Sequence, residues 1–129
     1  MARRVFAACK KILLFGCGCE LPASACRGGG ILMPHLNGIF INPSACLGSG
    51  CAIYHQVTIG AGENNGMFGS PRLGDNVVVY AGAKIIGPIF VGNDVVVGAN
   101  AVVTKSVVSG ATVVGANRIV TDRSRGTVL

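Results

Sequence analysis

The two histidines of this sequence, His35 and His55, are the side chains best suited to moving a proton near neutral pH. A neutral imidazole is a general base that can take the proton of a hydroxyl group as its oxygen attacks an electrophile. His35 lies in GGGILMPHLNG (28–38), a run of glycines and aliphatic residues without a charged side chain. Two interpretations of His35 are open: a structural histidine bonded to backbone, and a catalytic base.

Six cysteines are the other candidate nucleophiles or metal ligands, at positions 9, 17, 19, 26, 46 and 51. Their spacings match no zinc signature, and the chain lacks the cysteine density of a small disulfide-rich domain. We interpret them as small apolar side chains. Cys26 or Cys46 could carry an acyl group in a ping-pong reaction, although neither lies in a motif that indicates this.

A period of six residues predicts the elements that position these side chains. A short strand followed at once by a turn, repeated three times, closes a triangular coil of about eighteen residues with one aliphatic residue per side pointing inward. We predict an all-β solenoid, the left-handed parallel β-helix, over residues 19–108. The inward residues of the frame are Ile41, Leu47, Ile53, Ile59, Leu73, Val79, Ile85, Val91, Val97 and Val103.

Three segments depart from this period. Residues 3–15 have helical spacing, so a short amphipathic helix ending at Gly16 is expected within a lead-in of residues 1–18. Residues 61–72 (AGENNGMFGSPR) are polar and glycine-rich. The inward positions on either side of them, Ile59 and Leu73, are two residues further apart than two six-residue units. We expect an irregular loop extruded from the coil there. Residues 109–129 are expected to form a terminal strand and tail.

The frame also places the two histidines together. Each histidine follows an inward residue by two positions, Met33 before His35 and Ile53 before His55. The two histidines are twenty residues apart. This spacing equals one coil of eighteen residues plus a two-residue slip of the frame. We therefore expect the imidazoles on adjacent coils, about 5 Å apart along the axis, beside the extruded loop.

The composition of the chain indicates which kinds of binding partner to expect. Half of the residues are hydrophobic and only 12% are charged, so copies of the chain are expected to cover part of the surface in a homotrimer. The net charge of +6 is accompanied by no nucleic-acid module, so no nucleic-acid partner is expected. No stretch approaches the roughly 20 apolar residues of a membrane span. We expect a cytoplasmic protein that acts on a small molecule.

Four motifs together resemble the serine acetyltransferase branch of the hexapeptide acyltransferases. They are HLNGIFIN (35–42), VTIG (57–60), AGAKIIG (81–87) and GANAVVTK (98–105). The similarity extends over residues 19–120. Short, polysaccharide-associated members are the most similar, because one short helix stands where the true serine acetyltransferases have a large helical domain.

The resemblance implies catalytic roles for individual residues. His35 falls on the family's catalytic histidine, and Glu20, fifteen residues earlier, falls on the carboxylate that orients it. His55 falls at a variable position and is assigned a supporting or structural role. Pro34 and Arg27 depart from the pattern, which has an acidic and an aliphatic residue there. A histidine with a carboxylate on its far ring nitrogen would activate a hydroxyl group toward a thioester.

The resemblance also implies acetyl-CoA as co-substrate, lying along the solenoid between two subunits, and no metal. Ala81 and Ala99 are eighteen residues apart, so they stack on consecutive coils and leave a wall without large side chains. Thr104 and Lys105 match the family's VVTK element, and Arg118 lies where the family contacts phosphate groups. For the two alanines and Arg118, corner and solvated-surface roles remain the alternatives.

The extruded loop departs from the family where the acceptor binds. With the chains aligned on Pro71, Gly69 replaces the arginine that holds the serine carboxylate, and Ser70 replaces a histidine. A guanidinium is hard to substitute in that role, so we expect L-serine to be a poor acceptor and favour a sugar hydroxyl or amine. The loop residues expected to bind such an acceptor are Glu63, Asn64, Asn65 and Ser70.

Three alternatives to a sugar acetyltransferase remain open from the sequence. One is serine O-acetyltransferase, and another is a non-catalytic hexapeptide-repeat protein. The third is a γ-type carbonic anhydrase, which has the same coil but needs three histidine ligands for its zinc, whereas this chain has two histidines.

Overall fold

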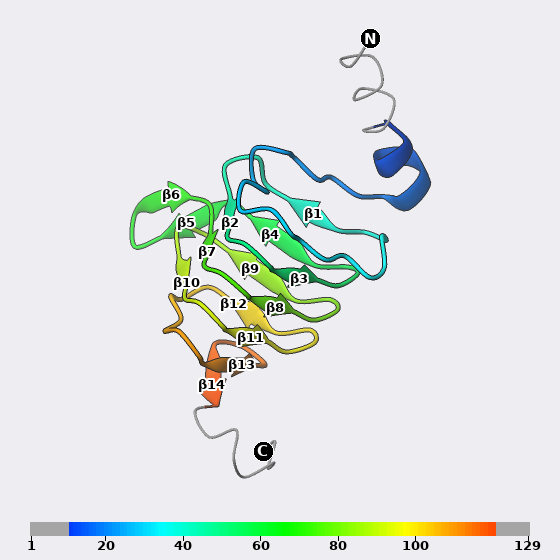
Figure 1. Cartoon of the computed structure of the whole chain (residues 1–129). Coiled ribbons are helices and arrows are strands. Elements are labelled where there is room, and N and C mark those ends of the chain that lie inside the picture. Colours follow the sequence, from blue (N-terminus) through cyan, green and yellow to red (C-terminus); the bar gives the residue numbers. More distant parts are fainter. Residues whose placement is uncertain (1–10, 121–129) are drawn as a thin grey trace.

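The computed structural model describes residues 11–120, in which a short helix precedes a solenoid of three sheets whose strands pair in parallel except for the last strand (Figure 1). A separate antiparallel hairpin pairs β5 (Gly62–Asn64) with β6 (Met67–Gly69). Sheet A contains β1 (Phe40–Ile41), β4 (Thr58–Gly60), β9 (Lys84–Ile86) and β12 (Val102–Val103). Sheet C contains β2 (Cys46–Leu47), β7 (Arg72–Leu73) and β10 (Phe90–Val91). Sheet B contains β3 (Ala52–Ile53), β8 (Val78–Val79), β11 (Val96–Val97), β13 (Thr112–Val114) and β14 (Arg118–Val120).

The chain visits sheets A, C and B in turn and then returns to A, so each coil stacks on the one before it. Residues eighteen apart pair in parallel, such as Val78 with Val96 and Lys84 with Val102. The predicted triangular coil of three six-residue sides is therefore confirmed. Below, an edge is named by the two sheets that it joins, in chain order.

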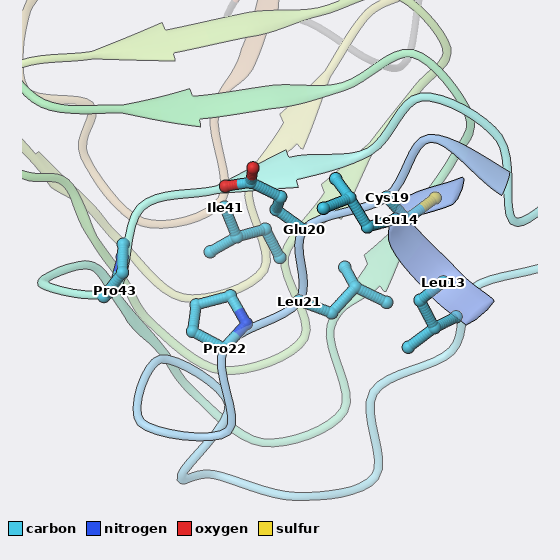
Figure 2. A pocket seen from close by; sticks show the side chains of 8 residues that line it. All are labelled: Leu13, Leu14, Cys19, Glu20, Leu21, Pro22, Ile41 and Pro43. Carbon is cyan, nitrogen blue, oxygen red and sulfur yellow. The ribbon is translucent and has the colours of Figure 1, made fainter. Parts of the chain in front are cut away.

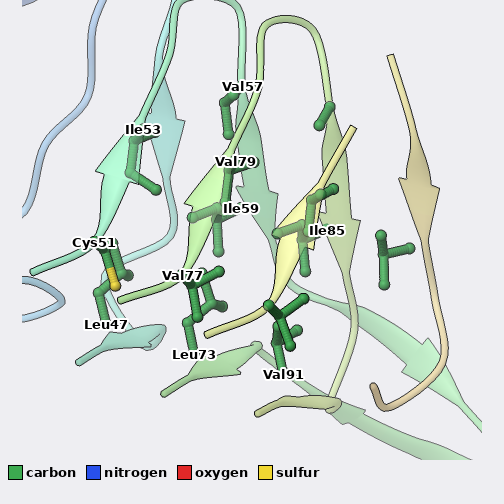
Figure 3. Packing of buried hydrophobic residues seen from close by; sticks show 14 of the residues in the cluster. Leu47, Cys51, Ile53, Val57, Ile59, Leu73, Val77, Val79, Ile85 and Val91 are labelled. Atoms are coloured by element: carbon green, nitrogen blue, oxygen red, sulfur yellow. The ribbon is translucent and has the colours of Figure 1, made fainter. Parts of the chain in front are cut away.

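Aliphatic side chains fill the interior of the prism, in the layers that Figure 3 shows. All ten inward residues that the period predicts are at most 4% exposed. Each such side chain stabilises the fold by roughly 1.5–3 kcal/mol relative to an exposed one. None of the polar or charged side chains in residues 11–120 is buried, so within that range the thiols of Cys19 and Cys51 are the only reactive groups in the core.

Glycine begins three successive turns of the C-to-B edge, at Gly48, Gly74 and Gly92, because successive coils approach closely there. A Cβ atom at Gly48 would collide with the carbonyl of Gly74, and one at Gly74 would collide with Asn93. Two residues further on, each turn has a residue of positive φ, such as Asn76 at 56° and Asp94 at 57°. Asparagine, aspartate and glycine tolerate this region best. The repeated glycine and the Asn or Asp after it therefore define the edge.

The N-terminal helix ends one residue later than expected. Residues 11–17 are helical, and Gly18 follows with a φ of 62°. The Gly18 N–H donates to the Leu14 carbonyl at 3.1 Å, and the Cys19 N–H donates to the Leu13 carbonyl at 2.9 Å. These two bonds and the left-handed glycine make a Schellman C-cap. The predicted end at Gly16 is therefore wrong, and residues 3–10 of the predicted helix lie outside the described residues.

The segment expected to be an irregular loop is an ordered hairpin. Its turn has Asn65 at φ 50° and Gly66 at φ 77°, the conformation that an Asn-Gly pair favours in a two-residue hairpin. Thr58 and Lys84 pair in register although they are 26 residues apart. The insertion is therefore eight residues in one side of the coil, and the count of two extra residues beyond two units is wrong.

The two ends of the solenoid differ in regularity. The first coil joins the second through isolated bridges, Glu20 with Phe40 and Leu32 with Ala52. At the other end, β13 pairs in parallel with β11, and β14 returns antiparallel to β13. An antiparallel return shields the edge of β13 from pairing with another chain.

Candidate active site

The turn that carries His35 is two residues longer than the turns below it. Leu32 pairs with Ala52 across twenty residues, whereas Phe40 pairs with Thr58 across eighteen. The two extra residues therefore lie between Leu32 and Phe40, in the turn of the B-to-A edge. His35 is exposed there. The period of the sequence places the two-residue slip between Ile39 and Ile41, whereas the structure places the extra residues earlier, in the histidine's own turn.

His35 and His55 begin a column of side chains that runs down the B-to-A edge. Their ring centroids are 5.7 Å apart with an interplanar angle of 77°, which confirms that they lie on adjacent coils. The registers of Ile53 with Val79 and of Val79 with Val97 continue the column through Ala81 and Ala99. Two imidazoles are thus followed by two methyl groups, and the lower part of this edge carries no large side chain in that column.

A second column, one residue earlier in each turn, forms an aromatic wall beside the histidines. Tyr54 and Tyr80 stack with centroids 5.1 Å apart and planes 34° apart. The His35 ring lies 6.5 Å from the Tyr54 ring. Neither tyrosine was among the site residues expected from the sequence, although the count that aligns Ala81 with Ala99 also aligns Tyr54 with Tyr80 once the hairpin is removed.

Hydrogen bonds hold the turns of this edge together. The Gln56 side-chain amide donates to Asn37 Oδ1, and the Lys84 ammonium donates to the Gln56 carbonyl oxygen at 2.8 Å. The Gly82 N–H donates to the His55 carbonyl at 3.0 Å. His55 Nδ1 is different, because it is buried and has no hydrogen-bond partner within residues 11–120.

Glu20 lies on the first coil, next to Phe40 of sheet A. Figure 2 shows it at the rim of a pocket between the end of the helix and sheet A. No hydrogen bond or ion pair joins Glu20 to His35 in the described part of the chain, so the structure does not assemble the carboxylate–histidine pair that the resemblance implies. The other residues that line the pocket are apolar: Leu13, Leu14, Cys19, Leu21, Pro22, Ile41 and Pro43.

The hairpin leaves the prism at the A-to-C edge, because it connects β4 of sheet A with β7 of sheet C. Figure 1 shows it on the opposite side of the coil from the turns that join β3 to β4 and β8 to β9. The expectation that the loop lies beside His35 is therefore wrong within one chain. Asn64 Nδ2 donates to the Thr104 carbonyl at 3.1 Å, and the Ser70 hydroxyl is bonded to Asn42 Oδ1 at 3.1 Å. Glu63 and Asn65 are exposed.

The five residues expected to bind CoA occupy three places. Ala81 and Ala99 share the column of His35, as described above. Thr104 and Lys105 follow β12 at the A-to-C edge, where Thr104 exchanges hydrogen bonds of 2.7 and 2.9 Å with Asn117. Arg118 is exposed on β14, at the C-terminal end of sheet B.

The described cysteines are free thiols. Burial raises the pKa of the Cys26 thiol and, as the largest of several effects, that of the Cys51 thiol. A raised pKa lowers the thiolate fraction, which is the reactive form, so these two are poor nucleophiles. Among residues 11–120, no three His, Cys, Asp or Glu side chains are placed to hold a metal ion. No helix in that range has the length and apolar character needed to cross a bilayer.

Comparison with known proteins identifies the repeat. The family model "Bacterial transferase hexapeptide (six repeats)" matches residues 70–105. The chain is 40% identical over 90 residues to a serine acetyltransferase of Mycobacterium tuberculosis, covering 70% of this chain and 39% of that protein. It is 41% identical over 105 residues to a serine acetyltransferase of Helicobacter pylori, covering 81% of this chain and 61% of that protein. The chain therefore spans less than two thirds of the length of either relative.

Solved structures resemble the fold. The crystal structure of the serine acetyltransferase of Neisseria gonorrhoeae superposes with a TM-score of 0.66 at 33% identity, over 76% of this chain and 40% of that one. A serine acetyltransferase described as a complex with CoA superposes with a TM-score of 0.64 at 34% identity, over 72% of this chain and 38% of that one.

Fold and repeat together define a class, the left-handed parallel β-helix built from hexapeptide repeats. Within that class, residues 70–105 match the hexapeptide repeat of the bacterial transferases, and the chain is similar to serine acetyltransferases. The predicted fold class is thus confirmed. The comparisons give no support to the narrower resemblance to polysaccharide-associated short forms.

Proposed function

We propose that the protein transfers the acetyl group of acetyl-CoA to the hydroxyl group of a small acceptor, with His35 as the general base. The observation that carries this proposal is the column of His35, His55, Ala81 and Ala99 on one edge of a hexapeptide-repeat prism. It supplies a proton acceptor at one end and a stretch without bulky side chains below it, against which the pantetheine arm of CoA can lie. The homologous serine acetyltransferases support the same reaction class.

The chemistry needs few groups. A neutral nitrogen of His35 takes the hydroxyl proton as the acceptor oxygen attacks the thioester carbonyl. The new C–O bond forms, the C–S bond breaks, and the thiolate of CoA leaves with the proton that the imidazolium returns. Exposure of His35 on its lengthened turn lets an acceptor reach the ring. Backbone N–H groups of the same turn are candidates to meet the developing oxyanion.

The remaining site residues lie at the other edge of sheet A, so we propose a site shared between copies of a trimer. If three copies turn sheet A toward a common axis, the B-to-A edge of each copy meets the A-to-C edge of its neighbour. His35 and the alanine column would then face the neighbour's hairpin, Thr104 and Lys105. A lysine there is suited to the phosphate groups of CoA.

L-serine is the first candidate acceptor, because the similar proteins and solved structures described above are serine acetyltransferases. A neutral polyol such as a sugar is the second candidate, and Gly69 favours it. An arginine at position 69 would have to displace Pro88, which a Cβ atom there would approach to 3.0 Å. Without that guanidinium, the carboxylate of serine lacks the bidentate partner that it binds best.

Steady-state kinetics with acetyl-CoA and a panel of acceptors test both proposals. Release of CoA thiol that depends on an added acceptor is expected. A millimolar or lower KM for L-serine, with no turnover of sugars and nucleotide sugars, would establish serine and eliminate the polyol. The reverse pattern would establish the polyol. No acceptor-dependent release with either class of acceptor would overturn the proposed acetyl transfer.

A further inference from the structure

One polar atom on the B-to-A edge is left unexplained by the reaction above. His55 Nδ1 is buried without a hydrogen-bond partner, and leaving a buried polar atom unpaired costs about 1–3 kcal/mol. Two nearby side-chain donors point to other acceptors, since Gln56 donates to Asn37 and Lys84 donates to the Gln56 carbonyl. The imidazole of His35 is the neighbouring side chain with a ring N–H that no such hydrogen bond uses.

We propose that His55 Nδ1 accepts a hydrogen bond from a ring N–H of His35 and so fixes the tautomer in which the other His35 nitrogen is the base. This inference rests on the proposed function and makes His55 a positioning residue. Two ring nitrogens bonded at about 3 Å, each roughly 1.2 Å from its own ring centroid, place the centroids at most about 5.4 Å apart. The observed separation of 5.7 Å, at an edge-on angle of 77°, is a few tenths of an ångström longer. A small shift of the exposed His35 turn, with rotation about the soft terminal torsion of histidine, forms the bond.

Glu20, the carboxylate expected to orient His35, lies at a different place in the fold. Glu20 stands on sheet A at the rim of an apolar pocket and forms no ion pair with His35 within the described residues. His55, in contrast, is in ring contact with His35 from the coil below. A neutral imidazole can hold the tautomer of its partner, but it does not neutralise the imidazolium that forms during transfer. The main effect of His55 should therefore come before the reaction starts, by keeping the catalytic nitrogen of His35 unprotonated.

Histidine NMR tests the pair directly, because the chain has two histidines and a variant at position 55 leaves one. The protein is labelled with 15N-histidine and studied at pH 8, where imidazoles are mostly neutral. In the unmodified chain, the ring nitrogens of His35 should show one tautomer. In His55→Phe, which keeps a ring but no acceptor, they should show a mixture. His55→Asn, whose amide lies near the place of Nδ1, should restore one tautomer, whereas His55→Gln should not.

A matched variant separates His55 from Glu20. Glu20→Gln should leave the His35 tautomer unchanged, since neither a hydrogen bond nor an ion pair joins the two side chains within residues 11–120. A tautomer that changes in Glu20→Gln, or that stays the same in His55→Phe, overturns the proposal, as does a mixture in the unmodified chain. Should His55→Phe fail to fold, the contrast between His55→Asn and His55→Gln decides: equal tautomer ratios in the two also overturn it.

Kinetics give the second readout. His55→Phe should lower kcat for acetyl transfer by at least about tenfold, with KM for acetyl-CoA changed by less than about twofold, and His55→Asn should recover most of kcat. A purely structural histidine would lower the melting temperature without changing the tautomer of His35. If no acetyl transfer is found in the unmodified protein, the proposed function fails, while the NMR result still decides whether the two imidazoles are paired.

Discussion

At the level of single residues, the two histidines differ in how much room the fold gives them. His35 is exposed on a turn with two extra residues, whereas His55 is half-buried in a turn of normal length, with Nδ1 covered. A base must reach a substrate, and a positioning group must be held still. The same residue type is therefore suited to two roles on adjacent coils, and the length of the turn decides which role each can take.

Replacing His35 tests the base. His35→Asn should leave the solenoid folded, because an exposed side chain on a surface turn contributes little packing. It should lower turnover by roughly 10²–10⁴, the range that a general base contributes. Circular dichroism and steady-state acetyl transfer measure the two effects. Val108→Ala, at a residue that is 70% exposed on the C-to-B edge, is the control for handling and expression. Full activity of His35→Asn would remove His35 from the mechanism.

The buried thiol of Cys51 makes a prediction about pH. Burial is the largest effect that raises the pKa of this thiol, whose S–H also donates to the carbonyls of Gly48 and Gly74 at 3.5 and 3.4 Å. A group with a raised pKa in the folded state contributes stability that is present below its unfolded pKa and is lost as the pH rises. The free energy of unfolding should therefore fall as the pH rises above about 8.5.

Urea titrations at pH 7 to 10 measure how the free energy of unfolding changes with pH. Cys51→Ala removes the thiol, so it should lower stability at pH 7 but show a smaller further loss on going to pH 10. Iodoacetamide at pH 8 should label Cys51 only after denaturant is added. Equal alkaline slopes in the two proteins would show that this thiol makes no contribution to the pH dependence.

At the level of the elements, the corners of the prism are set by backbone contact more than by side chains. A Cβ atom at Gly48 would meet the backbone of Gly74 and the carboxylate of Asp75, neither of which can move without shifting the next coil. Gly48→Ala should therefore lower the free energy of unfolding by about 1–3 kcal/mol, the usual cost of overpacking. Thermal or urea unfolding measures it.

Gly16→Ala is the matched control for that substitution. Gly16 lies in the helix with nothing within 4 Å of the position of a Cβ atom, and alanine is favoured over glycine in a helix by about 1 kcal/mol. It should be neutral or stabilising. A loss of stability in Gly16→Ala equal to that in Gly48→Ala would mean that the corner contact is not the cause.

The repeat shows what a sequence can and cannot predict about such a fold. Inward positions such as Val79 and Val97 follow from the six-residue period alone, because each side of the coil must bury one aliphatic residue. It is harder to predict which of the three sheets a given residue belongs to. The fourteen residues from Ile59 to Leu73 fit two sides plus two residues or one side plus eight, and both leave the same phase. The register of Thr58 with Lys84 and the pairing of β5 with β6 decide between them, and the Asn65–Gly66 pair was the available signal.

For the candidate site too, local spacing was predictable from the sequence, and long-range placement was not. The adjacency of His35 and His55 needs only the local count, and the structure has it. The distance between Glu20 and His35 depends on how the irregular first coil packs, which a spacing of fifteen residues does not specify. The tyrosine wall was hidden because Tyr54 and Tyr80 lie on either side of the inserted hairpin, so their alignment appears only after the eight residues are removed.

At the level of the whole molecule, the proposed site is divided between two edges of sheet A. His35 and the alanine column lie on one edge, and the hairpin with Thr104 and Lys105 lies on the other. The outward side chains of the sheet between them carry little charge, with Phe40, Thr58 and Val102 beside Lys84. A threefold assembly around this sheet would bury those side chains and bring unlike edges of neighbouring copies together.

Mixing two defective chains tests this arrangement. One chain carries His35→Asn, and the other has a shortened hairpin in which Asn-Gly replaces residues 63–68, which keeps the Gly62–Gly69 pair. Each should be nearly inactive alone and should run as a trimer by light scattering, at about three times the chain mass of 13.1 kDa. In randomly mixed trimers, about a quarter of the interfaces unite an intact His35 with an intact hairpin from the neighbour. Coexpressed or denatured and co-refolded mixtures should therefore recover activity toward that fraction of the unmodified protein. If each site is contained in one chain, mixing restores nothing, and a monomer at micromolar concentration would contradict the assembly itself.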